Sequence, residues 1–231
     1  MRNKAIGIIG GMVPTASQYF YGQLIRYAQK YYGAKKNEDF PEIYLASVPV
    51  PDFVVSREKK GKALKILLER LSYFNKLPIS FYCIACNTAH LILNELRLET
   101  NKPFISLLEE VPLFLKKKKI RRIGLLASPV TIKTKMYYEP LKKIGIELAV
   151  PSINDIKILG QIILETIAGD NYRRNRELVQ KIADRLIKKG AEGILIGCTE
   201  ISFLFPEGQK IKVFDTLDIL AKAVLEKYYL L

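Results

Sequence analysis

Two cysteines of this chain stand at matching places, each at the end of an apolar segment. Cys86 follows the run ISFYCIA at 79–85, and Cys198 follows GILIG at 193–197. Polar residues come directly after both thiols, in the segments CNTAH and CTE. A thiolate is a base and a nucleophile, and it forms more readily at the N-terminus of a helix. The pattern therefore favours thiol chemistry at two related positions.

The remaining cysteine and the single histidine fit neither a disulfide scaffold nor a metal site. Three cysteines are an odd number, and Cys83 lies inside an apolar run where packing in a core accounts for it. Reduced thiols are typical of the cytoplasm, which is the compartment that we expect. His90 lies four residues after Cys86, about one helical turn along the chain. It either tunes that thiol or is a structural imidazole, and we expect no bound metal.

Strand-like and helix-like segments alternate along the sequence. Within 175–189, for example, Leu178, Ile182 and Leu186 recur at helical spacing. Pro14 marks the start of a helix, and Gly33 marks its end. This alternation is typical of α/β proteins in which helices flank parallel sheets. The predicted strands are AIGII, EIYLASV, ISFYCIA, FISL, RIGLLA, IELAV, GILIG and KVFD.

A weak internal repeat relates the two halves of the chain. Three segments of the first half have counterparts in the second half, in the same order. The pairs are AIGIIGGMVPTAS with RIGLLASPVTIKT, ISFYCIACNTAH with EGILIGCTEIS, and FISLLEE with KVFDTLD. The repeat predicts two similar domains, each with a cysteine at the carboxyl end of a strand. Open parallel sheets bind their ligands at that end.

A thiol on either face of a small ligand suits proton transfer at a stereocentre, because one group removes a proton and the other returns one. The motifs GIIGGMVPTAS, CNTAH and GCTE, in this order and spacing, resemble the cofactor-independent aspartate/glutamate racemase family, closest to its aspartate racemase branch. The resemblance covers essentially the whole chain. CNTAH and GCTE together are specific, whereas GIIGGM alone is weak and does not match the dinucleotide-binding fingerprint.

The resemblance implies an α/β fold of two similar flavodoxin-like domains with parallel sheets and an active site in the cleft between them. The first domain would comprise residues 1–103 and 212–231, and the second residues 104–211. The resemblance also implies an amino-acid racemase, commonly a homodimer, that needs neither pyridoxal phosphate nor a metal ion. Cys86 and Cys198 would be its catalytic acid/base pair. The substrate-binding residues would be Gly11, Met12, Asn87, Thr88, Ala89, Ser128, Thr131, Thr199 and Glu200.

The chain departs from the aspartate racemase branch where that branch binds the substrate side chain. An arginine follows Pro-Asp in the branch, whereas PVPDFVV places Phe53 there. The branch also has a lysine before Ala-Gly on a helix of the second half, whereas ETIAGDN places Ile167 there. Arg57, Arg173 or Arg174 could compensate, and we expect Arg57 to do so. The default substrate is an acidic amino acid, bound with weak selectivity for aspartate.

Some of these residues have structural alternatives, and the activity has an alternative as well. Asn87 and Thr88 can cap a helix, and Glu200 can interact with the dipole of one. A related enzyme could use one cysteine as an acid and the other as a nucleophile, as in an isomerase or decarboxylase of small dicarboxylates. These alternatives remain open at the level of the sequence.

The charge and the apolar segments bear on possible partners. The net charge of +14 and the cluster KKKKIRR at 116–122 raise the possibility of nucleic-acid binding. No nucleic-acid-binding motif accompanies the charge, and such lysines are also typical of a helix C-terminus. No apolar run approaches the roughly 18 residues that span a membrane. The segment MRNKAIGIIGGMV mimics a secretory signal, but its internal counterpart argues against that reading. We therefore expect neither a nucleic-acid partner nor a membrane.

Overall fold

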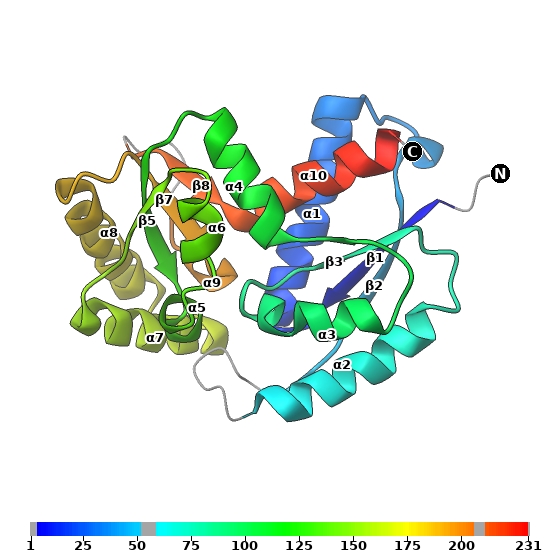
Figure 1. Cartoon of the computed structure of the whole chain (residues 1–231), viewed down its shortest axis with the longest axis horizontal. Coiled ribbons are helices and arrows are strands. Elements are labelled where there is room, and N and C mark those ends of the chain that lie inside the picture. Colours follow the sequence, from blue (N-terminus) through cyan, green and yellow to red (C-terminus); the bar gives the residue numbers. More distant parts are fainter. Residues whose placement is uncertain (1–3, 52–58, 206–210, 231) are drawn as a thin grey trace. The chain divides into compact units, whose positions relative to one another are not determined.

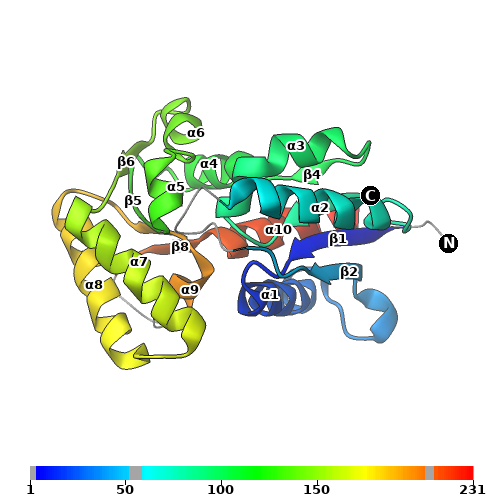
Figure 2. The same cartoon turned by 90° about the horizontal axis from the view of Figure 1, so that it is seen from below.

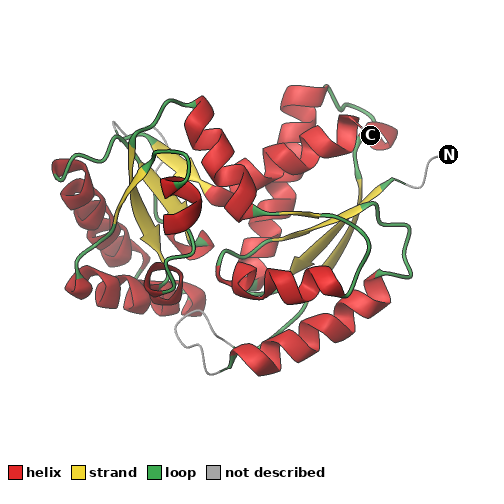
Figure 3. Ribbon diagram, in the orientation of Figure 1, coloured by secondary structure: helices red, strands yellow, loops and turns green. Residues whose placement is uncertain are grey.

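The computed structural model describes residues 4–51, 59–205 and 211–230. These residues divide into two compact units, which are treated separately below. Unit 1 comprises residues 1–110 and 217–231, and unit 2 comprises residues 111–216. In each unit the described residues form one sheet with helices on its faces (Figures 1 and 3).

The sheet of unit 1 contains four parallel strands in the order β2-β1-β3-β4. The strands are β1 (Ala5–Gly10), β2 (Glu42–Ser47), β3 (Phe81–Ile84) and β4 (Phe104–Ile105). Every residue of β1 and β3 is buried, whereas β2 at the edge is partly exposed. Continuous apolar runs are what a strand needs when helices cover both faces of a parallel sheet.

Helices cover both faces of this sheet. They are α1 (Pro14–Tyr32), α2 (Lys60–Phe74), α3 (Leu93–Leu98), α10 (Thr216–Leu230) and two short 3₁₀ helices, η1 (Asn37–Asp39) and η2 (Thr88–Ile92). Figure 2 shows α2 and α3 on the face opposite α1. α10 packs against α1, since Tyr19 donates a hydrogen bond to Asp218 at 3.1 Å and the rings of Tyr32 and Tyr229 stack. Gly33 ends α1 in the left-handed conformation, as the sequence predicts.

Unit 2 has a sheet of the same type, with the strand order β6-β5-β7-β8. Its strands are β5 (Arg122–Ala127), β6 (Glu147–Ala149), β7 (Ile194–Gly197) and β8 (Val213–Asp215). All the pairings are parallel. β1, β3 and β4 therefore occupy the same places in their sheet as β5, β7 and β8 in theirs. These are the segments that the internal repeat pairs, so the prediction of parallel α/β sheets in two similar halves is confirmed.

The helices of unit 2 are α4 (Leu107–Lys117), α5 (Pro129–Lys133), α6 (Tyr138–Lys142), α7 (Ile153–Ala168), α8 (Tyr172–Lys188) and α9 (Thr199–Ser202). The first turn of α4 belongs to unit 1. α8 packs on β5 and β7, and α7 packs against α8. The buried side of α8 carries Val179, Ile182 and Leu186, in agreement with the helical spacing of the sequence. Lys116 and Lys117 lie in the last turn of α4 and Lys118 and Lys119 come directly after it, as expected at a helix C-terminus.

The unit boundaries lie a few residues beyond those expected from the sequence, which were 103/104 and 211/212. β4 follows the first of these expected boundaries and pairs with β3 of unit 1. β8 follows the second and pairs with β7 of unit 2. Each short strand thus completes the sheet that precedes it in the chain.

Candidate active site

In unit 1, two groups of predicted site residues lie at the same end of the sheet, just after the carboxyl ends of two strands. Gly11 and Met12 come directly after β1, and Cys86 to Ala89 come after β3. β1 and β3 are neighbours, and the Ala85 N–H extends their pairing by donating to the Ile9 carbonyl at 3.1 Å. The predicted residues Gly11, Met12, Cys86, Asn87, Thr88 and Ala89 therefore lie at the carboxyl ends of two adjacent strands.

The loop after β1 is held by a residue that the sequence reasoning missed. The Ser17 hydroxyl, on α1, accepts a hydrogen bond from the Gly11 N–H at 2.8 Å. The Val48 N–H donates to the Gly10 carbonyl at 3.0 Å on the other side of the loop. Ser17 is 2 % exposed. The sequence did contain a sign of this role. Ser17 is a polar residue on the apolar face of α1, in helical register with Phe20 and Leu24.

Cys86 and Cys83 lie in different surroundings on the same strand segment. Cys83 is fully buried within β3, and burial raises the pKa of its thiol. Cys86 lies beyond the end of β3 and is 6 % exposed. It belongs to a cluster of buried side chains that also contains Met12 and Val48. Of these two thiols, Cys86 is the one at the strand terminus, and Cys83 packs in the core as expected.

The helices that follow the two thiols are short. A five-residue 3₁₀ helix, η2, follows Cys86, and the four-residue α9 follows Cys198. Asn87 and Cys198 occupy the N-cap positions, and neither makes a side-chain capping bond. Of the two residues considered as helix caps, Asn87 thus holds the N-cap position of η2, whereas Thr88 is the first residue inside that helix. With so few aligned peptide units, a helix dipole contributes less to a thiolate than a full-length helix would.

His90 is a buried, neutral imidazole with a partner for each ring nitrogen. Nδ1 lies 2.9 Å from the Cys86 carbonyl oxygen, and Nε2 accepts a hydrogen bond from the Leu107 N–H at 3.0 Å. Because Nε2 is an acceptor, the proton of the neutral ring is on Nδ1 and is donated to the carbonyl. Burial lowers the pKa of His90 from 6.5 to about 4, so the ring is uncharged near neutral pH.

In unit 2, a second group of predicted residues occupies the corresponding edge. Ala127 of β5 and Gly197 of β7 are partners in register, and Ser128 and Cys198 follow them. Ser128 accepts a hydrogen bond from the Thr131 N–H at 3.2 Å and donates to the Thr131 hydroxyl at 3.0 Å. Ser128 thereby caps α5. Within this unit, the predicted residues Ser128, Thr131, Cys198, Thr199 and Glu200 are all buried.

The thiol of Cys198 contacts a carboxylate. Its Sγ lies 2.9 Å from Glu200 Oε2 and donates a hydrogen bond to it. Cys198 is 7 % exposed and Glu200 is 5 % exposed. The sequence assigned Glu200 either to the substrate or to a helix dipole, and the contact with the thiol was not expected. A carboxylate that accepts a hydrogen bond from a thiol favours the protonated form of the thiol, since a thiolate would place a second negative charge beside the carboxylate.

The structure describes only some of the residues considered for binding the substrate side chain. Phe53 and Arg57 lie outside the described residues. Ile167 is on α7 and is 39 % exposed. Arg173 forms an exposed ion pair with Glu177 at 3.8 Å. Arg174 forms an ion pair at 3.6 Å with Glu165, whose side chain is partly buried.

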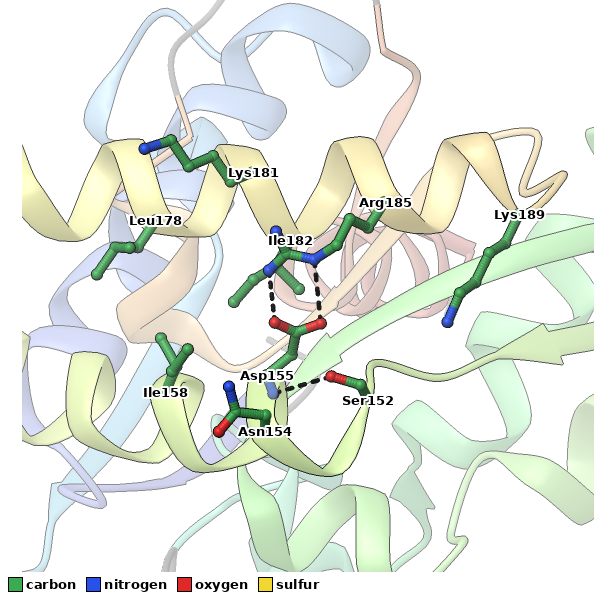
Figure 4. Close-up of a pocket in the computed structure, with 9 residues that line it drawn as sticks. All are labelled: Ser152, Asn154, Asp155, Ile158, Leu178, Lys181, Ile182, Arg185 and Lys189. Atoms are coloured by element: carbon green, nitrogen blue, oxygen red, sulfur yellow. Dashed lines mark hydrogen bonds and ion pairs between the residues drawn. The ribbon is translucent and has the colours of Figure 1, made fainter.

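A surface hollow between α7 and α8 is separate from the predicted site residues of unit 2 (Figure 4). The Asp155 carboxylate lies at its centre, bound by two nitrogens of Arg185, and its N–H donates to Ser152 Oγ at 3.1 Å. Burial alone would raise the pKa of Asp155, but the hydrogen bonds from Arg185 and Ser152 outweigh it and lower that pKa. The two charged groups satisfy each other, so this ion pair connects α7 to α8.

The described residues contain neither a metal-ligand cluster nor a membrane-spanning helix. Among residues 4–51, 59–205 and 211–230, no three His, Cys, Asp or Glu side chains are grouped as metal ligands. In the same part of the chain, no helix has the length and apolar character required to span a bilayer. All three cysteines are described, and none forms a disulfide.

Comparisons with known proteins establish the family. The model of the Asp/Glu/hydantoin racemase family matches residues 9–224, so the chain belongs to this family. It is 25 % identical over 224 residues to the broad specificity amino-acid racemase RacX of Bacillus subtilis (strain 168), covering 96 % of this chain and 97 % of that protein.

Solved structures show the same fold. The crystal structure of an aspartate racemase homologue from Pyrococcus horikoshii OT3 matches with a TM-score of 0.81 and 28 % identity, covering 98 % of this chain and 99 % of that one. The aspartate racemase of Picrophilus torridus matches with a TM-score of 0.85 and 23 % identity, covering 98 % and 94 %. The sequence-based resemblance to the aspartate/glutamate racemases is thus confirmed.

Proposed function

We propose that this protein is an amino-acid racemase in which Cys86 and Cys198 exchange the α-proton of the substrate. One observation carries the proposal: the two cysteines follow β3 and β7, which hold the same position in two sheets of the same strand order. Membership of the Asp/Glu/hydantoin racemase family supports it. The proposal includes independence from pyridoxal phosphate and metal ions, a cytoplasmic location and a homodimer, as expected from the resemblance and the reduced thiols.

The proposed reaction is a 1,1-proton transfer at the α-carbon. One cysteine, as the thiolate, removes the α-proton, and the thiol of the other gives a proton to the opposite face. The intermediate carries negative charge on the α-carboxylate, so donors aimed at that group lower the barrier. The N–H groups and side chains of Asn87, Thr88 and Thr199 supply such donors in the proposal. Gly11 and Met12 line the site beside Cys86, and Ser128 and Thr131 do so beside Cys198.

The contact between Cys198 and Glu200 supports a proposal of different resting roles for the two thiols. Since Cys198 donates to the carboxylate, we take it as the protonated partner in the free enzyme, with Cys86 as the base. In the reverse direction Cys198 must lose its proton, and Glu200 is placed to accept it at 2.9 Å. Glu200 then acts as a relay for Cys198 as well as a substrate-binding residue.

Glu200→Gln tests this role. An amide cannot take up the thiol proton, so we expect kcat/KM to fall by ~10²-fold or more. The fall must be equal for both enantiomers, because the equilibrium constant between them is one. In a Cys86→Ala background, Cys198 should react with iodoacetamide at lower pH once the neighbouring negative charge is removed.

Glu139→Gln is the matched control, since it makes the same change at an exposed position of unit 2. If Glu200→Gln and Glu139→Gln both leave racemisation and alkylation unchanged, Glu200 has no part in proton transfer.

The range of amino acids that the enzyme accepts depends on the residue at position 167, where the aspartate racemase branch has a lysine and this chain has Ile167. Ile167 is apolar, and a carboxylate brought near it without a counter-charge loses hydration that is not replaced. The similarity to a racemase named for broad specificity points the same way. We propose that the enzyme accepts several amino acids and binds aspartate without strong preference. Incubation with a panel of L-amino acids, followed by chiral chromatography, identifies the substrates.

Ile167→Lys should restore selectivity. Ile167 is 39 % exposed, so a lysine fits without burial of its charge. We expect kcat/KM for aspartate to rise about tenfold relative to an uncharged amino acid, as one new charged contact would give. Ile153→Lys is the control, because Ile153 is on the same helix and is 79 % exposed. An equal gain in both variants would mean that the added charge acts through the general field, and that Ile167 does not face the substrate.

A further inference from the structure

His90 is the single histidine of the chain, and neither of its ring nitrogens is directed to solvent or to substrate chemistry. It is 5 % exposed and lies in η2, four residues after Cys86. One of its two hydrogen bonds is local, and the other reaches a residue 17 positions further along the chain. One partner is the main chain of Cys86, and the other is Leu107, the first residue of α4. The imidazole therefore connects the turn after β3 to the start of a helix.

The main chain needs both of these contacts. β3 ends at Ile84, so the Cys86 carbonyl lies beyond the part of the strand that pairs in the sheet. The Leu107 N–H is in the first turn of α4, where the N–H groups have no acceptor within the helix. Buried main-chain groups without partners destabilise a fold, and the imidazole satisfies one of each kind. Only the tautomer with hydrogen on Nδ1 makes both contacts.

The turn that His90 holds also restricts the direction of the Cys86 side chain. The peptide plane of the Cys86 carbonyl includes the Cα of Cys86, so a fixed carbonyl restricts the orientation of the Cα–Cβ bond. A displacement of about 1 Å in a reacting group can reduce a rate by 10²-fold. The short η2 gives little support of its own, because regular 3₁₀ turns have weaker hydrogen-bond geometry than α-helices.

We propose that His90 is the positioning residue of Cys86, in which the Nδ1–H fixes the Cys86 carbonyl and Nε2 secures the turn to the first N–H of α4. The role of Cys86 in proton transfer rests on the proposed function, but its positioning by His90 is a separate property. His90 does not touch the reacting atoms in this proposal. Its neutral form, maintained by burial, is the one that can accept from Leu107.

Two conservative variants separate the two contacts. In His90→Asn, the side-chain amide N–H takes the place of Nδ1–H and the bond to Cys86 is retained, while the Leu107 N–H loses its acceptor. In His90→Gln, the longer side chain brings its oxygen to the place of Nε2, and the Cys86 carbonyl loses its donor. Each variant removes one of the two hydrogen bonds of the imidazole. If His90 were only a structural residue, the two variants would therefore lose similar amounts of stability and of Cys86 reactivity.

The test is the rate of Cys86 alkylation by iodoacetamide in a Cys198→Ala background, followed by mass spectrometry from pH 6 to 10. We expect His90→Gln to react at least tenfold more slowly at Cys86 than His90→Asn, at similar midpoints of urea unfolding. In the enzyme with both cysteines, kcat should show the same order of the variants while KM changes little. Equal alkylation rates in the two variants would overturn the proposal. Separated alkylation rates without racemisation of any amino acid would uphold the positioning and reject the proposed function.

A measurement on the unaltered protein guards against variants that fail to fold. The single histidine gives one set of ring ¹⁵N signals in a two-dimensional NMR spectrum. We expect the neutral Nδ1–H tautomer, unchanged between pH 8 and pH 5. A ring that carries its proton on Nε2, or that becomes charged above pH 5, would contradict the contact with Leu107.

Discussion

Cys86→Ser and Cys198→Ser should each reduce racemisation by about 10³-fold or more. A hydroxyl is a much weaker base than a thiol, and removal of a general base costs up to about 10⁴-fold. In the proposed mechanism each reaction cycle uses both groups, one as base and one as acid, so neither loss would be compensated by the other cysteine. Chiral chromatography of the products measures racemisation directly.

Exchange in D₂O adds information about the individual thiols. Either mutant can still exchange the α-proton of the enantiomer that faces its remaining cysteine, which NMR detects as loss of the α-proton signal without loss of chirality. Cys83→Ala is the control, because Cys83 is buried in the core within β3. This substitution should lower the stability of the fold somewhat and leave racemisation unchanged. Near-normal racemisation by either serine mutant would rule out the two-base mechanism.

Gly11→Ala should be the most destabilising small substitution near the site. Gly11 has φ +87°, and a Cβ there would lie 2.1 Å from the Val48 nitrogen and 2.6 Å from the Ser47 carbonyl carbon. Both are main-chain atoms that cannot rotate away. Strain in the left-handed region and overpacking together cost roughly 3–5 kcal/mol. We expect a large drop in the urea midpoint and loss of activity, because the loop also positions Met12.

Gly33→Ala is the matched control for this change. Gly33 has φ +70°, but a Cβ there meets no atom within 4 Å. Only the conformational cost of about 1–2 kcal/mol remains. Equal losses in the two variants would show that the close approach to β2 is not what requires glycine at position 11.

The sequence predicted the strands well because their apolar runs and the repeat agree. All eight segments proposed as strands are strands, and Gly33 ends α1 where its helix was expected to end. Cys86 and Cys198 were placed correctly at strand termini for the same reason. The division of the chain was placed less closely, because β4 and β8 are only two and three residues long.

The details around the thiols depend on contacts that spacing does not reveal. Residues two apart do not face each other on a helix, so the Cys198–Glu200 bond could not be read from GCTE. It forms because Cys198 is in extended conformation, with φ −153° and ψ 126°. The position of His90 four residues after Cys86 indicated proximity, but not that the carbonyl would be the partner. Its second partner, Leu107, is a tertiary contact 17 residues away.

The return of α10 to α1 has a consequence for biosynthesis. Unit 2 is one continuous stretch, residues 111–216, whereas unit 1 needs residues from before and after it. During translation, the Tyr19–Asp218 and Tyr32–Tyr229 contacts cannot form until α10 has left the ribosome. Unit 2 can therefore complete its fold first, although its residues are made second. Until then the first half of the chain lacks α10 as a packing partner for α1. It is therefore the part of the chain that most needs protection by chaperones during synthesis.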